Sequence, residues 1–224
     1  MNNNKRIYLF ILLILFFIGI GNISGQGLRN SHHDFHGAAW ANGEYCLPCH
    51  TPHNADQTVP NSPLWNHQVT SAVYSVYTSS SLDATIGQPS GVSKLCLSCH
   101  DGTVAVDSHS GITTGTRFIV NKAKLGTALT NDHPISFTYD AALATVDKEL
   151  YDPSITMSGL GGTIEQDLLR NGKLECTSCH DPHISRNTSG CASCHFMHTT
   201  MTTVSVSIWK SNTGSALCLT CHKK

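Results

Sequence analysis

The sequence predicts a mostly irregular fold, with a few short α-helices and minimal β-structure, which is organised around bound groups rather than a large peptide core. Of the 224 residues, only 13% are charged and 7% are aromatic. Glycine, serine and threonine are plentiful, and a chain of this kind buries little apolar surface of its own. The second observation is the unit Cys-X-X-Cys-His, which is repeated five times and contains all ten cysteines. The five copies are Cys46–His50, Cys96–His100, Cys176–His180, Cys191–His195 and Cys218–His222.

This unit has the spacing of covalent haem c attachment. Two cysteines separated by two residues can each form a thioether with one vinyl group of the same haem, and the next histidine becomes the proximal ligand of the iron. The sequence therefore predicts five haem c groups. The expected thioether residues are Cys46, Cys49, Cys96, Cys99, Cys176, Cys179, Cys191, Cys194, Cys218 and Cys221, and the expected proximal ligands are His50, His100, His180, His195 and His222.

Two other kinds of site also use Cys-X-X-Cys pairs, namely redox dithiols and zinc ribbons. A zinc ribbon consumes four cysteines at a time, and ten cysteines do not divide into fours. A redox dithiol occurs once in a chain rather than five times, and neither kind of site requires histidine at the next position. The pattern therefore favours haem in all five units.

The N-terminus is typical of a secretory signal peptide. Lys5 and Arg6 precede an apolar run over residues 7–20, and small and polar residues follow, with cleavage expected after Gly25. An uncleaved membrane anchor is the alternative, but a membrane span needs ~20 apolar residues and this run is shorter. We expect residues 1–25 to be the signal peptide and residues 26–224 to form a single pentahaem cytochrome c domain. The protein would be exported to the cell surface or the extracellular space, with the periplasm as the alternative.

The charge of the mature chain argues against nucleic acid as a partner. The formal net charge is −1 and includes Lys5 and Arg6, which would be removed with the signal peptide. Two propionates on each haem would add further negative charge. An acidic protein is repelled by a polyanion.

The chain has 14 histidines, so enough remain to supply a distal ligand to every haem. His53, His183 and His198 each follow a proximal histidine by three residues, and we expect them to ligate a neighbouring haem. His67 lies in an apolar, aromatic segment and is either a ligand or a structural residue. The histidines near the mature N-terminus either include a ligand or belong to a solvated tail, whereas we expect His109, in a Ser/Gly-rich run, to be solvated. The distal candidates are His33, His36, His53, His67, His133, His183 and His198.

Local patterns predict a few short elements. Apolar residues recur at helical spacing over residues 139–150. Thr163 and Gln166 form the pattern of a capping box, with Asn171-Gly172 as the expected end of that helix. Residues 74–82 fit a short helix or a loop, and residues 204–209 alternate as in a short strand.

The five histidine endings favour electron transfer over catalysis. A haem iron with two histidine ligands has no open position for a substrate. Pentahaem nitrite reductases are similar in haem count, but they are longer and carry a Cys-X-X-Cys-Lys unit at the catalytic haem, which this chain lacks. We therefore expect no enzymatic activity, with a haem enzyme that has one open iron as a less favoured alternative.

From about Ser31 to His183, a series of short motifs carries a resemblance to a known family. The motifs are His33–Phe35, Cys46–Asn54, Pro63–His67, Ser93–Thr103, Asn131–Phe137 and Leu174–His183. In this order they resemble multihaem c-type cytochromes of the doubled Cys-X-X-Cys-His class. They are particularly similar to the exported tetrahaem cytochromes that polymerise into extracellular conductive filaments. The fifth unit departs from the family's count of four.

The resemblance implies a single-file haem chain in a head-to-tail homopolymer, in which an N-terminal histidine of one subunit ligates a haem of the next. His33 and His36 are the candidates for that role. Besides other copies of the chain, the implied partners are redox proteins or extracellular electron acceptors. The alternative is a soluble periplasmic pentahaem shuttle to a reductase, since the small pentahaem electron donors of nitrite reductase are similar in size and haem count.

Overall fold

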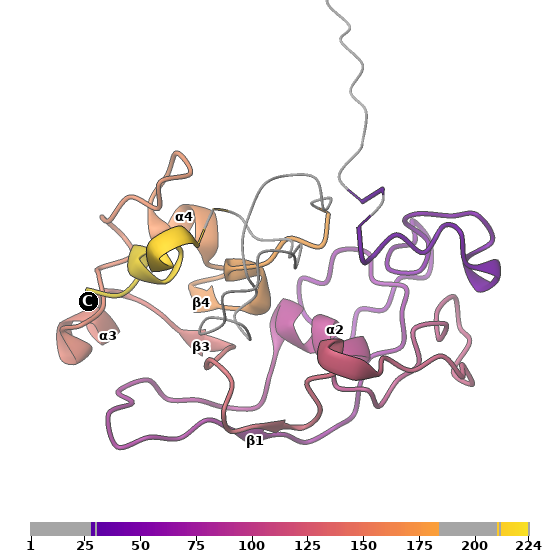
Figure 1. Ribbon diagram of the computed structural model, residues 1–224, viewed down its shortest axis with the longest axis horizontal. Helices are drawn as coiled ribbons and strands as arrows, with labels where there is room; N and C mark the ends of the chain where they lie inside the picture. The colour runs from indigo at the N-terminus through magenta and orange to yellow at the C-terminus, as the bar shows by residue number, and fades with distance from the viewer. Residues whose placement is uncertain (1–27, 30, 184–209, 211, 224) are drawn as a thin grey trace, which may run out of the picture.

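The computed structural model describes residues 28–29, 31–183, 210 and 212–223 (Figure 1). This part of the chain is mostly coil with short helices and very short strands, which confirms the predicted fold class at that level. The N-terminal residues lie at one end of the molecule, and α3, α4 and the C-terminus lie at the other. No helix in the described ranges is both long and apolar enough to cross a bilayer. The predicted signal peptide and the predicted strand over residues 204–209 fall outside these ranges.

The helical elements of the described ranges are all short. The α-helices are α2 (Gly91–His100), α3 (Ala141–Asp147) and α4 (Ile164–Leu168). The 3-10 helices are η1 (Ala39–Ala41), η2 (Asn121–Ala123), η3 (Cys176–Ser178), η5 (Thr213–Ser215) and η6 (Cys218–Thr220). Three of these elements carry Cys-X-X-Cys-His units, namely α2, η3 and η6, so much of the helical structure coincides with the predicted haem sites.

Two pairs of two-residue strands join distant parts of the chain. Strand β1 (Ser75–Val76) pairs in parallel with β2 (Ala128–Leu129). Strand β3 (Phe137–Thr138) pairs antiparallel with β4 (Lys173–Leu174). The segment 74–82 is therefore extended and irregular, which is the loop alternative. Because β4 directly precedes Glu175 and Cys176, its pairing with β3 holds the third unit against the middle of the chain.

The capping box predicted at α4 is present. The Thr163 hydroxyl accepts from the Gln166 N–H at 3.3 Å, and the Gln166 side chain accepts from the Thr163 N–H at 2.9 Å. The helix ends at Leu168 rather than at Asn171-Gly172. Asn171 and Gly172 instead form a tight turn, both at positive φ, which is the conformation that closes two-residue hairpins.

Helix α3 lies within the stretch of helical spacing over residues 139–150. Its first turn is capped by Asp140, whose carboxylate accepts from the Leu143 N–H at 2.8 Å. It ends where Lys148 adopts a left-handed conformation with a φ of 63°. The prediction of a helix here is confirmed, although the helix is shorter than the pattern.

Two small apolar clusters lie beside the Cys-X-X-Cys-His units. The larger one contains Phe137, Tyr139, Ala144, Leu150, Ile164, Leu168, Leu169 and Leu174, and Cys221 of the fifth unit packs against it. The smaller one contains Tyr74, Leu97 and Leu129, of which Leu97 belongs to the second unit. The peptide core is thus divided into patches, each of which positions a cysteine-bearing segment.

Candidate haem-binding centres

The four described units share one local conformation. In the first, third and fifth units, the N–H of the histidine donates to the carbonyl of the first cysteine, at 2.8 Å for His50, 3.0 Å for His180 and 3.0 Å for His222. The second unit forms the end of α2, which finishes at His100. In a single helical turn, residues three apart lie on the same face, so both sulfur atoms of a unit emerge on one side. None of the eight described cysteines forms a disulfide.

A hydrogen-bond network around Glu175 clamps the second unit to the third. Glu175 is 2% exposed and accepts from Ser93 of α2 and from the hydroxyl of Ser136 at 2.9 Å. The N–H of Cys176 donates to the Ser93 hydroxyl at 2.9 Å. The first cysteines of the two units are neighbours. A hydrogen bond between Cys96 and Cys176, followed by burial, holds the pKa of Cys96 well above its ordinary value.

The first unit lies against the other end of the second. The N–H of Asn66 donates to the carbonyl of Cys49 at 2.9 Å, and the next residue, His67, places its Nε2 3.5 Å from the Sγ of Cys99. Burial, followed by the charge of the nearby Cys49, raises the pKa of the Cys99 thiol to about 12. The second unit therefore lies between the first and the third.

Two of the histidines that end Cys-X-X-Cys-His units have a defined tautomer. The Nδ1 of His50 lies 2.5 Å from the carbonyl oxygen of Pro63, and the Nδ1 of His100 lies 2.8 Å from that of Ala123. A carbonyl oxygen only accepts hydrogen bonds, so Nδ1 carries the proton in both rings. Nε2 then keeps its lone pair, which is the arrangement of metal-binding histidines.

Three histidine rings from outside the motif positions lie beside three of the histidines that end Cys-X-X-Cys-His units. The ring centroids of His50 and His183 are 6.2 Å apart with an interplanar angle of 17°. Those of His33 and His100 are 6.0 Å apart at 60°, and those of His133 and His222 are 6.3 Å apart at 76°. The bond from a metal to an imidazole nitrogen is about 2 Å long, and the ring centre lies a further ~1 Å away. Two imidazoles on opposite sides of one metal therefore have their centroids about 6 Å apart. The three separations fit axial pairs.

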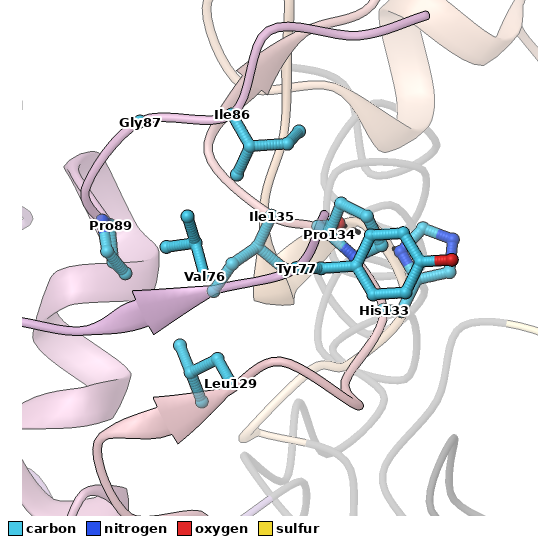
Figure 2. Close-up of a pocket in the computed structure, with 9 residues that line it drawn as sticks. All are labelled: Val76, Tyr77, Ile86, Gly87, Pro89, Leu129, His133, Pro134 and Ile135. Carbon is cyan, nitrogen blue, oxygen red and sulfur yellow. Dashed lines mark hydrogen bonds between the residues drawn. The ribbon is translucent and has the colours of Figure 1, made fainter. Parts of the chain in front are cut away.

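The rings of His133, which lies beside His222, and of His183, which lies beside His50, are also oriented through Nδ1. Nδ1 of His133 lies 2.8 Å from the carbonyl oxygen of Pro134, and Nδ1 of His183 lies 3.0 Å from a carboxylate oxygen of Asp181. Both partners are acceptors, so Nε2 is again the atom with a lone pair. His133 lies beside a small, mainly apolar pocket that includes Tyr77, Pro134 and Ile135 (Figure 2), and an apolar wall of this kind suits the edge of a porphyrin.

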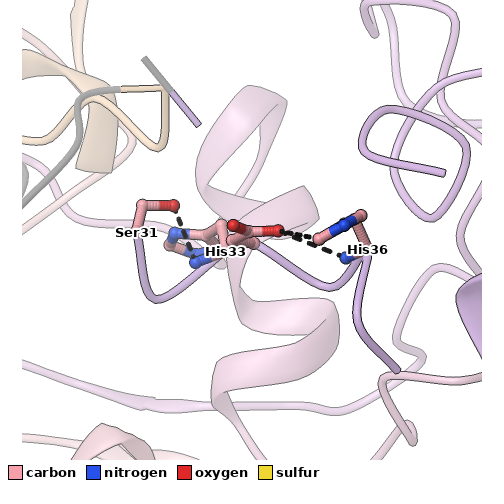
Figure 3. Close-up of polar contacts among 4 residues, drawn as sticks. Ser31, His33 and His36 are labelled. Carbon is pink, nitrogen blue, oxygen red and sulfur yellow. Dashed lines mark hydrogen bonds and ion pairs between the residues drawn. The ribbon is translucent and has the colours of Figure 1, made fainter. Parts of the chain in front are cut away.

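His33 is held in a different way. Its N–H donates to the Ser31 hydroxyl at 3.1 Å, while His36 pairs with the neighbouring carboxylate of Asp34 (Figure 3). Burial, followed by the charge of His100, lowers the pKa of His33 to about 4, so the ring is neutral near pH 7. Its Nδ1 is buried and has no hydrogen-bond partner in the described part of the chain. A neutral imidazole with an unsatisfied nitrogen fits a metal ligand.

The other distal candidates lie elsewhere. His36 is exposed and stacks on the ring of Tyr45, with centroids 4.4 Å apart, and His53 is also exposed. His198 lies outside the described residues, as do Cys191, Cys194 and His195 of the fourth unit.

His67 is buried, and each ring nitrogen lies near a backbone carbonyl oxygen, of which a neutral ring can donate to only one. Nδ1 lies 2.9 Å from the carbonyl oxygen of Gln68, and Nε2 lies 2.9 Å from that of Ala105. Burial lowers the pKa of His67, although the two carbonyls act in the opposite direction. Because its Nε2 is directed at a backbone carbonyl, this geometry favours the structural role over the ligand role.

The expectation that His109 is solvated was wrong, because this residue is only 3% exposed. Its backbone forms an isolated antiparallel bridge with His67, and its ring packs against Trp40 with centroids 5.7 Å apart. The Ser/Gly-rich run around His109 suggested a surface loop. The sequence contains no signal for the long-range bridge that buries the residue.

No model of a known protein family matches the chain, and no curated protein matches it. The case for haem therefore depends on the chain's own residues. Paired cysteines with both sulfurs on one face, and histidine rings at the separation of axial pairs, fit haem c.

Proposed function

We propose that this protein is an electron-transfer cytochrome, organised around five covalently attached haem c groups with bis-histidine ligation. The observation that carries the proposal is the set of three histidine pairs with ring centroids 6.0, 6.2 and 6.3 Å apart. Each pair joins the histidine of a Cys-X-X-Cys-His unit to a histidine from another part of the chain. Each haem, when bound, supplies a one-electron couple between ferrous and ferric iron.

The geometry supports three axial assignments. His183 is the distal ligand opposite His50, His33 is the one opposite His100, and His133 is the one opposite His222. In such pairs both axial positions are taken by protein nitrogen atoms. These three irons would have no open position for a substrate, which supports a carrier of electrons rather than an enzyme.

The packing of the units supports a chain of haems in contact. The second unit is adjacent to the first through Cys49 and Cys99, and to the third through Cys96 and Cys176. His183, which follows the third unit, faces the first unit. These contacts bring the first three units together, which supports electron transfer among their haems.

We propose that the exported protein acts as a subunit of an extracellular conductive filament. His33 faces His100 of its own chain, so His36 is the better candidate for a ligand given to the next subunit. Its side chain is 48% exposed, and Nδ1 lies 3.3 Å from Asp34, which orients the ring. A head-to-tail contact that does not close into a ring produces a filament. Electrons would pass on to redox proteins or extracellular acceptors.

Two measurements test the proposal. Carbon monoxide or nitrite added to the holoprotein should leave the low-spin haem spectrum unchanged, because no axial position is open. A haem that binds either ligand without losing a histidine would contradict the carrier function. Negative-stain microscopy of the secreted fraction should show filaments, whereas dispersed monomers at high concentration would favour the periplasmic shuttle.

A further inference from the structure

The junction between the second and third units contains a buried carboxylate that belongs to none of the axial pairs. Glu175 accepts hydrogen bonds from the backbone N–H and the hydroxyl of Ser93, and from the hydroxyl of Ser136. The Ser178 N–H donates to the backbone carbonyl of Glu175 at 2.8 Å. Three donors to the carboxylate suit an ionised group, which only accepts. Within the described ranges no lysine or arginine forms an ion pair with Glu175, so hydrogen bonds stabilise its charge.

This carboxylate touches the elements that carry both units. A Cβ atom on Gly91, the first residue of α2, would lie 2.9 Å from the Oε1 of Glu175. Glu175 also directly precedes Cys176, whose N–H donates to Ser93 in the same network. An ammonium group also joins this network, because that of Lys173 donates to the Ser90 hydroxyl at 3.2 Å.

The fifth unit has a fixed charge of the opposite sign. The ammonium of Lys210 donates to the Thr220 hydroxyl at 2.9 Å and to the Ser158 carbonyl at 3.0 Å. Thr220 lies between the two cysteines of this unit, so the positive charge is held within the attachment turn. Asp152 and Asp167 also lie at this end and, like Lys210, are partly exposed, so water screens all three charges more than that of Glu175.

We propose that Glu175 is a redox-tuning residue that keeps the potentials of the second and third haems below that of the fifth, where Lys210 acts in the opposite direction. A ferric haem carries one more positive charge than a ferrous haem, so a buried carboxylate favours the ferric form and an ammonium favours the ferrous form. Each electron that leaves one iron reduces the next one, so the difference drives electrons towards the C-terminal end. The inference rests on the proposed function and adds a direction to it.

The test is a redox titration of the Glu175→Gln holoprotein, after its mass has shown that five haems are attached. The substitution keeps the shape of the side chain and removes its charge. Two components of the titration should rise in potential, while the others stay unchanged. Glu165→Gln is the matched control, because Glu165 is an exposed residue of α4 and its variant should titrate like the parent protein. A fully loaded Glu175→Gln protein with unchanged potentials would overturn the proposal.

Lys210→Met gives an independent result if Glu175→Gln does not accumulate as holoprotein. One component should fall in potential, and in the parent protein this component should titrate above at least two of the others. Arg117→Gln, in an exposed loop, is the control for removal of a positive charge. If no component falls, or if the component that falls is the lowest in the parent protein, the gradient is refuted. Missing haems or an open iron would instead count against the proposed function itself.

Discussion

The imidazole rings of His50 and His183 lie 6.2 Å apart and are nearly parallel, with an interplanar angle of 17°. His133 and His222 have almost the same separation, 6.3 Å, but their planes are inclined by 76°. The two pairs therefore hold the same kind of ring in different relative orientations. This difference gives the assignments a spectroscopic test, because the angle between axial imidazole planes determines the electronic symmetry at a low-spin ferric iron.

We predict two classes of signal in the electron paramagnetic resonance spectrum of the oxidised protein. The near-parallel pair should give an ordinary rhombic low-spin signal, and the strongly inclined pair should give a highly anisotropic one. His183→Ala should remove a rhombic component, and His133→Ala should remove an anisotropic component. If either variant loses the signal expected for the other, the axial assignments are wrong.

Replacement of His133 by methionine should raise the potential of one haem. Methionine opposite a proximal histidine gives a higher potential than a second histidine, here by on the order of 100 mV. A redox titration followed in the visible spectrum measures the change. The matched control is His36→Met, since His36 faces Tyr45 within its own chain, and the monomeric form of this variant should keep the parent titration curve.

His67→Gln tests whether His67 is structural. Because both ring nitrogens lie 2.9 Å from backbone carbonyls, the substitution should leave all five haems low-spin while it lowers the free energy of unfolding by about 1–3 kcal/mol. Urea unfolding and the visible spectrum together give both readouts. A new high-spin haem in this variant would show that His67 is an axial ligand.

Gly91→Ala should destabilise the junction around Glu175. Gly91 has a φ of 52°, and an added Cβ would lie 2.9 Å from the Glu175 carboxylate, so we expect a loss of about 2 kcal/mol. Gly87→Ala is the control, because nothing lies within 4 Å of the Cβ position there. Urea unfolding of the oxidised proteins provides the comparison. Equal midpoints for the two variants would show that the close approach of Glu175 has no energetic consequence.

His36→Ala tests the subunit contact. Filaments should be lost from the secreted fraction while the haem content of the monomer is kept, because His36 lies outside the axial pairs within the chain. His53→Ala, at another exposed histidine, serves as a comparison by the same microscopy. Normal filaments from the His36 variant would exclude this residue as a shared ligand.

Local patterns predicted much of the fold. The Thr163–Gln166 capping box and the helical spacing near α3 depend on residues close in sequence, and both helices are present. The coil content followed from the composition. The end of α4 was predicted less well, because Asn171-Gly172 could stop a helix or close a hairpin, and the pairing of β3 with β4 decides between them.

The candidate site was predictable only in part. Spacing alone identified the units and suggested that His183 ligates a neighbouring haem, but not that its ring faces His50. That pairing joins residues far apart in the sequence and depends on how the units pack. The burial of His109 was missed for the same reason, because its bridge to His67 is a long-range contact.

The most direct test of the central claim is the intact mass of the secreted protein, followed by peptide mapping. The mass should equal that of residues 26–224 plus five haems, with one haem on each Cys-X-X-Cys-His peptide, including Cys191–His195. A protein with free thiols, bound zinc or fewer than five covalent haems would contradict the claim that this chain folds around five haem c groups.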